Sequence, residues 1–192
     1  MLAFNADKHE YRWRGCIVPS VTQILGPLNN FSHVDPVTLE NARLSGVDQH
    51  RMMELELLGT LDEASLPVWL EPRLNALRLF VTETAFRPVA VERPMYSQRY
   101  EFAGTTDTVG LVRGRMSCVD LKWSLAGPIV GLQLSGYEIL WNESNPDELI
   151  LDRYALVLKD NGDYKLTRYD NPRDRLTFLA ALTLHKWKRE NL

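Results

Sequence analysis

The period of the hydrophobic pattern changes once along this chain, and that change most constrains the fold. Up to residue 85, apolar side chains recur at the three- and four-residue spacing of helices. From Pro88 onward they alternate with polar side chains, which is the period of a strand with two unlike faces. Three successive segments follow this second pattern, and we predict strands at residues 89–96, 101–112 and 116–123.

Helices are predicted on both sides of these strands along the chain. Asp35 can cap a helix that begins at Pro36, because Asp accepts backbone N–H groups and proline suits the first helical position. Asn161-Gly162 is a strong signal for a tight hairpin turn. The remaining predicted elements are helices at Val21–Leu25, 36–58, 67–85, 127–141 and 173–188, and strands at 149–158 and Tyr164–Arg168. This order predicts one domain over residues 1–192, of the α/β or α+β class, with a mixed central β-sheet flanked by helices.

Composition sets limits on the class of protein. The chain has 192 residues, of which 45% are hydrophobic and 24% charged, as is usual for a soluble globular domain. No apolar run is long enough to cross a bilayer, and residues 1–14 lack the apolar core of a secretory signal. The two cysteines, Cys16 and Cys118, are too few for a four-cysteine zinc or iron–sulfur site. We therefore expect a cytoplasmic protein with reduced thiols and no membrane contact.

The net charge argues against one kind of nucleic-acid protein. The formal charge is −3, whereas a protein that coats nucleic acid through the phosphate backbone should be basic. A nuclease is not excluded by this argument, because divalent metals neutralise the carboxylates of its active site.

One hairpin carries the side chains that could do chemistry. If Arg113-Gly114 forms a two-residue turn, Asp107 pairs directly with Asp120 across the hairpin, with Cβ atoms roughly 4.5–5.5 Å apart. Lys122 lies two residues further on, so it projects from the same face as Asp120. Arg-Gly is not the best sequence for a two-residue turn, and a longer loop with a small register offset stays open.

Two carboxylates this close repel each other unless a cation neutralises them. Mg²⁺ binds such oxygens and leaves positions for water and substrate phosphate. An adjacent lysine can orient or deprotonate a metal-bound water, or stabilise charge that develops on the phosphate. The arrangement therefore suits hydrolysis of a phosphodiester, and a surface hairpin with incidental ion pairs is the alternative interpretation.

The acid-x-lysine pattern alone is weak, because about one match is expected by chance in a chain of this composition. A second match occurs at Asp163-Tyr164-Lys165. We interpret it as exposed hairpin surface, because it follows the Asn161-Gly162 turn and has no opposed carboxylate deep in a strand.

Several segments together resemble the successive motifs of RecB-like PD-(D/E)XK nucleases, in order and in spacing. They are Gly104-Thr105-Thr106-Asp107, Asp120-Leu121-Lys122, Gln133-Leu134-Ser135-Gly136-Tyr137, the upstream Ser20-Val21-Thr22-Gln23-Ile24-Leu25, and residues 46–54 with His50. The resemblance covers about residues 19–184 and implies a restriction-endonuclease-like core. One departure is the spacing from Gly46 to His50, which is longer than in many family members. The chain lacks four cysteines and helicase motifs, so it resembles the small standalone enzymes of bacteriophages and prophages.

The resemblance implies a DNA nuclease, most simply an exonuclease, dependent on Mg²⁺ or Mn²⁺ and active in recombination, repair or phage DNA metabolism. It implies a bacterial or phage-infected host cytoplasm and allows for a recombination or phage partner protein. The implied metal ligands are the Asp107 and Asp120 carboxylates, the Leu121 backbone carbonyl and His50. Lys122 would serve the attacking water, Gln133 and Tyr137 would brace the site or touch DNA, and Glu92 could add an acid.

Other interpretations stay open. The runner-up function is a nuclease-fold DNA-binding or accessory module with weak or no catalysis, and a protein-interaction domain is a third. Without the resemblance, we would interpret His50 as a surface histidine and Cys118 as a buried structural thiol. The basic residues 185–189 could contact DNA, but we favour their interaction with the dipole of the closing helix. The sequence predicts neither cleavage polarity, substrate strandedness, DNA-versus-RNA preference nor oligomeric state.

Overall fold

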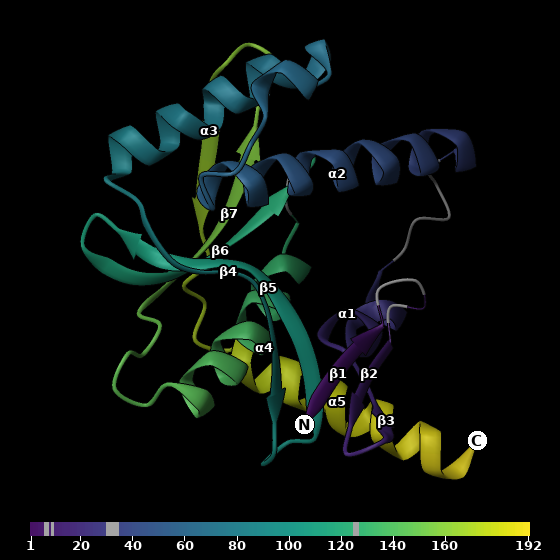
Figure 1. The fold of residues 1–192 in the computed structure, drawn as a ribbon. Helices are drawn as coiled ribbons and strands as arrows, with labels where there is room; N and C mark the ends of the chain where they lie inside the picture. The colour runs from purple at the N-terminus through teal and green to yellow at the C-terminus, as the bar shows by residue number, and fades with distance from the viewer. Residues whose placement is uncertain (6–7, 9, 30–34, 125–126) are drawn as a thin grey trace.

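The computed structural model describes residues 1–5, 8, 10–29, 35–124 and 127–192 (Figure 1). Its strands are β1 (Leu2–Asn5), β2 (Glu10–Trp13), β3 (Cys16–Val18), β4 (Arg87–Ser97), β5 (Phe102–Val112), β6 (Arg115–Lys122), β7 (Asp152–Leu158) and β8 (Tyr164–Arg168). Its α-helices are α1 (Val21–Leu25), α2 (Pro36–Leu57), α3 (Glu71–Thr84), α4 (Ile129–Ser144) and α5 (Asp174–Asn191). Short 3₁₀ turns occupy Gly26–Leu28, Glu63–Ser65 and Val68–Leu70. No helix in these ranges is long and apolar enough to cross a membrane.

The central sheet has five strands in the order β4-β5-β6-β7-β8. All neighbours are antiparallel except β6 and β7, which are parallel and are joined through α4. This is a mixed sheet flanked by helices, so the predicted fold class is confirmed. The predicted hairpin register is also confirmed, because the β5–β6 ladder runs from Thr108↔Val119 to Val112↔Arg115. Arg113 and Gly114 both have positive φ, 51° and 76°, as a two-residue turn of type I′ requires.

Two apolar clusters lie on opposite faces of this sheet. Helices α1, α4 and α5 cover one face, while α2 and α3 cover the other (Figure 1). Side chains alternate along each strand, so Val109 of β5 joins the cluster beneath α4, and Leu121 of β6 joins the cluster beneath α2 and α3. The expectation that Leu121 points into a core is confirmed, because its side chain is fully buried.

A second, small sheet of three antiparallel strands, β1-β2-β3, packs against the main one. The sequence pattern predicts no strand before Pro19. The strands of the small sheet have only three or four residues, and Tyr11 and Val18 are their only buried apolar side chains. Tyr11 and Val18 contact Ala103 of β5. A periodic signal cannot develop over so few residues.

Helix α2 exposes several apolar side chains of its N-terminal half. Val37, Leu44 and Val47 are at least half exposed, whereas Met52 and Met53 are buried. The reason is its position, since only the C-terminal half of α2 lies over the sheet and α3, and the N-terminal half extends beyond them (Figure 1). That half instead forms a wall of the cavity described next.

Candidate active site

The carboxylate–lysine hairpin opens into a cavity of about 890 Å³. Residues of α1, α2, β2, β4, β5, β6 and α4 line it. The β5–β6 ladder ends at Thr108↔Val119, and Asp107 and Asp120 are the next residues along the two strands. Asp107 Oδ2 accepts the backbone N–H of Leu121 at 2.7 Å, so its carboxylate reaches across to β6. Both carboxylates are buried and line the same cavity.

A chain of polar contacts joins the Asp120 side of the cavity to helix α4. Lys122 Nζ lies 2.6 Å from Asp120 Oδ2 and donates to Gln133 Oε1 at 2.9 Å. Gln133 Nε2 donates to Asp120 Oδ1 at 3.2 Å and to the Tyr137 hydroxyl at 3.0 Å. The structure therefore brings together Asp120, Lys122, Gln133 and Tyr137. Gln133 and Tyr137 are one helical turn apart, which places both on the face of α4 that meets the sheet.

Gly104 allows this close approach. A Cβ built on Gly104 would lie 3.0 Å from Val21 Cγ2 and 3.1 Å from Tyr137 Cε1. The glycine before Asp107 thus lets α1 and α4 pack tightly on β5. Ser20 caps α1, because its Oγ accepts the Gln23 N–H and the Gln23 side chain accepts the Ser20 N–H.

On the other side of the cavity, His50, Glu92 and Asp107 form a group that could hold a metal ion. Their ligand atoms all lie within 4.8 Å of one another. His50 Nδ1 is 3.5 Å from Asp107 Oδ2 and 3.9 Å from Glu92 Oε1. Of the predicted ligands, His50 and Asp107 therefore lie together and Glu92 joins them, whereas Asp120 is not part of this group and contacts Lys122. Leu121 contributes an N–H to Asp107, and a role for its carbonyl stays a prediction.

Glu92 reaches this group through an unusual backbone conformation. It lies between the register pairs Val91↔Thr108 and Arg93↔Thr106, at the place opposite Asp107, and has φ of 45°. A non-glycine residue in this region costs on the order of 1–3 kcal/mol and is often found at functional sites. Sequence analysis gave Glu92 only as an additional acid, because the pattern of a strand does not reveal a positive φ.

The buried charges alter each other's protonation. Burial raises the pKa of the Asp107 carboxyl and raises that of Asp120 to about 6. The negative charge of Asp107 raises the pKa of His50 to about 9, despite the opposing effect of burial. Burial also lowers the pKa of Lys122, but the charges of Asp120 and Asp107 outweigh it and the net shift is upward. His50 and Lys122 are therefore the cations of the site at neutral pH.

This donor set fits a hard divalent cation. Carboxylate oxygens suit Mg²⁺ and Mn²⁺, and one imidazole nitrogen is compatible with Mn²⁺. The buried Asp107 carboxylate, whose pKa is raised by burial, is a group that gains from a compensating cation. A metal at this position would displace the proton of His50.

A network behind the cavity fixes its floor, and sequence analysis missed it. Gln49, fully buried beside His50, donates to the Lys122 backbone carbonyl at 3.5 Å. Arg73 donates to Gln49 Oε1 at 2.6 Å and stacks on the Trp123 ring, 3.7 Å from its centroid. A signal for Arg73 is present in the sequence, since it interrupts the apolar face of its helix directly before Leu74.

The comparisons with known proteins find similarity only among solved structures. No protein-family model matches the chain, and no curated protein sequence matches it. A "Putative exonuclease" from Eubacterium rectale is similar with a TM-score of 0.47 and 11% identity, over 75% of this chain and 65% of that one. This chain thus spans about two thirds of its length. The alkaline exonuclease LHK-Exo from Laribacter hongkongensis has a TM-score of 0.38 and 18% identity over 74% and 84% of the two chains. Its complex with dAMP gives 0.37 and 14% over 90% and 92%.

Proposed function

We propose that the chain is a divalent-metal-dependent deoxyribonuclease that hydrolyses phosphodiester bonds. One observation carries the proposal: two buried carboxylates, Asp107 and Asp120, meet at the open end of one hairpin with Lys122 in contact with the second. We further propose exonuclease action in recombination, repair or phage DNA metabolism, in the cytoplasm of a bacterium or an infected host cell.

The metal would be Mg²⁺ or Mn²⁺, held by Asp107 together with His50 and Glu92, with Asp120 facing it across the cavity. When bound, such a cation supplies Lewis-acid stabilisation of the negative charge on the phosphate. The positive φ of Glu92 supports its inclusion among the ligands, because the strained backbone accompanies a carboxylate that lies next to His50 and Asp107.

Lys122 would act on the reacting phosphate through its ammonium. Asp120 and Gln133 hold Lys122 Nζ from two sides, and the Tyr137 hydroxyl fixes the Gln133 amide. Because the pKa of Lys122 is raised, its ammonium keeps its charge at neutral pH and serves as a hydrogen-bond donor. It would position the attacking water or stabilise charge that develops on a phosphate oxygen.

Basic side chains at the rim of the active-site cavity support the proposal of a polyanionic substrate. Arg43 and Arg51 of α2 line it, both with exposed side chains. Each has one carboxylate partner, Glu40 or Glu54, so the pairs can exchange partners when a phosphate arrives. Opposed carboxylates would repel DNA in a module that only binds it, and this favours catalysis over an accessory role.

The test is degradation of linear and covalently closed circular duplex DNA in Mg²⁺, Mn²⁺ or EDTA. We expect metal-dependent release of acid-soluble nucleotides from the linear form alone. Nicking of the circular form would make the enzyme an endonuclease. DNA binding without cleavage in either metal would instead leave the accessory module as the function.

A further inference from the structure

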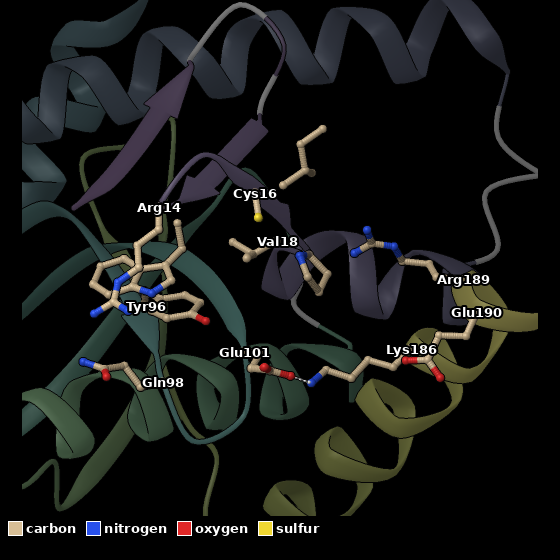
Figure 2. Close-up of a pocket in the computed structure, with 12 residues that line it drawn as sticks. Arg14, Cys16, Val18, Tyr96, Gln98, Glu101, Lys186, Arg189 and Glu190 are labelled. Atoms are coloured by element: carbon tan, nitrogen blue, oxygen red, sulfur yellow. Dashed lines mark hydrogen bonds and ion pairs between the residues drawn. The ribbon is translucent and has the colours of Figure 1, made fainter.

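A second cavity, of about 620 Å³, lies between the small sheet and the C-terminal half of α5 (Figure 2). Its wall includes Arg14 from the β2–β3 turn, Tyr96 from β4, and Lys186 and Arg189 from α5. The basic segment 185–189 therefore does more than end a helix, since two of its side chains line a cavity. The interaction with the helix dipole is compatible with this placement, because Lys188 and Arg189 lie in the last turn of α5.

We propose that this second cavity binds the single-stranded part of the DNA substrate, a few nucleotides from the bond that is cut. The proposal rests on the proposed nuclease function and adds the place where the strand runs outside the active site.

The charges of the cavity suit phosphates. Arg14 and Arg189 lie on opposite sides of it, with Cys16 and Val18 between them (Figure 2). Lys186 is already paired with Glu101 at 2.6 Å, whereas no ion pair links Arg14 or Arg189 to a carboxylate within the described ranges. Glu190 is the other acid on the wall, so the arginines leave a small positive excess in a protein of net charge −3.

Aromatic side chains accompany these cations. Trp13 and Tyr96 stack with their ring centroids 4.5 Å apart, and the Arg14 guanidinium lies 5.6 Å from the centroid of Trp13. Both rings are only partly buried and line the cavity. Aromatic and arginine faces next to cations bind single strands without sequence preference, because every base has a face that can stack.

The two cavities are neighbours along the chain. Pro19 lines the second cavity and Ser20 lines the active-site cavity. On β2, Tyr11 lines the active-site cavity and Trp13 lines the second cavity, and two residues of a strand span only about 7 Å. A strand that leaves the active site therefore reaches the second cavity within a few nucleotides. Its volume lies in the roughly 300–1,000 Å³ range of small-ligand pockets, so it has room for nucleotides of a single strand.

The test compares Arg14→Gln/Arg189→Gln with a matched control, Arg87→Gln/Arg173→Gln, which removes two exposed arginines that line neither cavity. Binding of a labelled single strand of about 12 nucleotides is measured by fluorescence anisotropy in EDTA over a series of salt concentrations. We expect about tenfold weaker binding by the double variant. We also expect the slope of the logarithm of the binding constant against the logarithm of the salt concentration (the salt slope) to be smaller in magnitude by about 1.4, since each lost phosphate contact on a single strand contributes about 0.7. The control should keep both values of the parent. Arg189→Gln alone, at an exposed position, should give about half of the change in slope.

Cleavage of a strand of about two nucleotides, which is too short to extend from the active-site cavity into the second one, is measured in Mn²⁺ with the same proteins. We expect the rate of Arg14→Gln/Arg189→Gln to match the parent. An unchanged salt slope in this variant, or an equal loss in the control, would overturn the inference about the second cavity. A parent protein that cleaves neither these single strands nor linear duplex DNA in metal would instead mark the failure of the proposed nuclease function.

Discussion

Lys122 Nζ lies 2.6 Å from Asp120 Oδ2, two residues back on the same strand. Side chains two apart on a strand share a face, so β6 itself brings the pair together. The ion pair leaves Asp107 to interact with His50 on the far side of the cavity. The site thus divides into a lysine side and a side with a candidate metal group.

The second acid-x-lysine match provides a first prediction. Asp163 is exposed and pairs with Lys159 at 2.5 Å, and Lys165 is exposed on the edge strand β8. We expect Asp163→Ala and Lys165→Ala to keep DNA cleavage within about threefold of the parent rate, because exposed pairs of this kind contribute little. Initial rates in Mn²⁺ give the comparison. A loss as large as that of Asp120→Ala would mean that the active site lies on the β7–β8 hairpin and not on the β5–β6 hairpin.

Glu92 provides a test of the metal group. Metal binds the folded site and not the unfolded chain, so Mn²⁺ should raise the melting temperature of the parent by mass action. Glu92→Gln removes one proposed ligand of the group and should reduce the Mn²⁺-induced rise by at least about half. Glu71→Gln, an exposed acid on α3 outside the cavity, should show the full rise. Equal rises in all three proteins would exclude Glu92 as a ligand.

The protonation of His50 predicts how stability depends on pH in EDTA. Its pKa is raised by Asp107 from 6.5 to about 9 in the folded protein, so the fold binds this proton more tightly than the unfolded chain does. The resulting stabilisation is complete below about pH 6.5 and is lost as the pH rises through about 9. The melting temperature of the metal-free protein should fall across this interval. His50→Gln should flatten the fall, and an identical pH profile in the two proteins would disprove the contact.

Arg73 should matter for stability far more than the half-buried Arg78 on the same helix. It is buried, donates to Gln49 and to the Leu158 carbonyl, and stacks on Trp123. Arg73→Met should lower the free energy of unfolding by about 2–4 kcal/mol, because the groups it satisfies lose their donor in the interior.

The matched control is Arg78→Met, which breaks the ion pairs of a half-buried arginine with Glu56 and Glu63 and should cost about 1 kcal/mol or less. Urea denaturation of the two variants measures both values. Similar losses of unfolding free energy in the two variants would mean that the buried contacts of Arg73 do not stabilise the structure around the cavity.

Local signals in the sequence were sufficient for much of the fold. The turn at Arg113-Gly114 set the register of Asp107 and Asp120, because a two-residue turn fixes every later pair in a hairpin. The strand Tyr164–Arg168 begins and ends where the Asn161-Gly162 turn predicts. Such features depend on neighbouring residues only, and the sequence records them directly.

Features that depend on distant contacts could not be predicted in this way. The positive φ of Glu92 depends on its place between β5 and α2, and the role of Gln49 depends on Arg73 from another helix. The small N-terminal sheet depends on contacts of Tyr11 with β5. In each case the determining partner is far away in the sequence, and no local pattern reports it.

Asp107 is the residue on which the proposed metal-dependent cleavage of DNA depends most. The most direct measurement is the initial rate of nucleotide release from linear duplex DNA by the parent and by Asp107→Asn, in Mn²⁺ and in EDTA, with thermal melts to show that both are folded. The parent should cleave only with metal, and Asp107→Asn should be slower by at least about 100-fold, since it loses a buried charge at the reacting centre. A folded Asp107→Asn protein that cleaves at the parent rate would contradict the account.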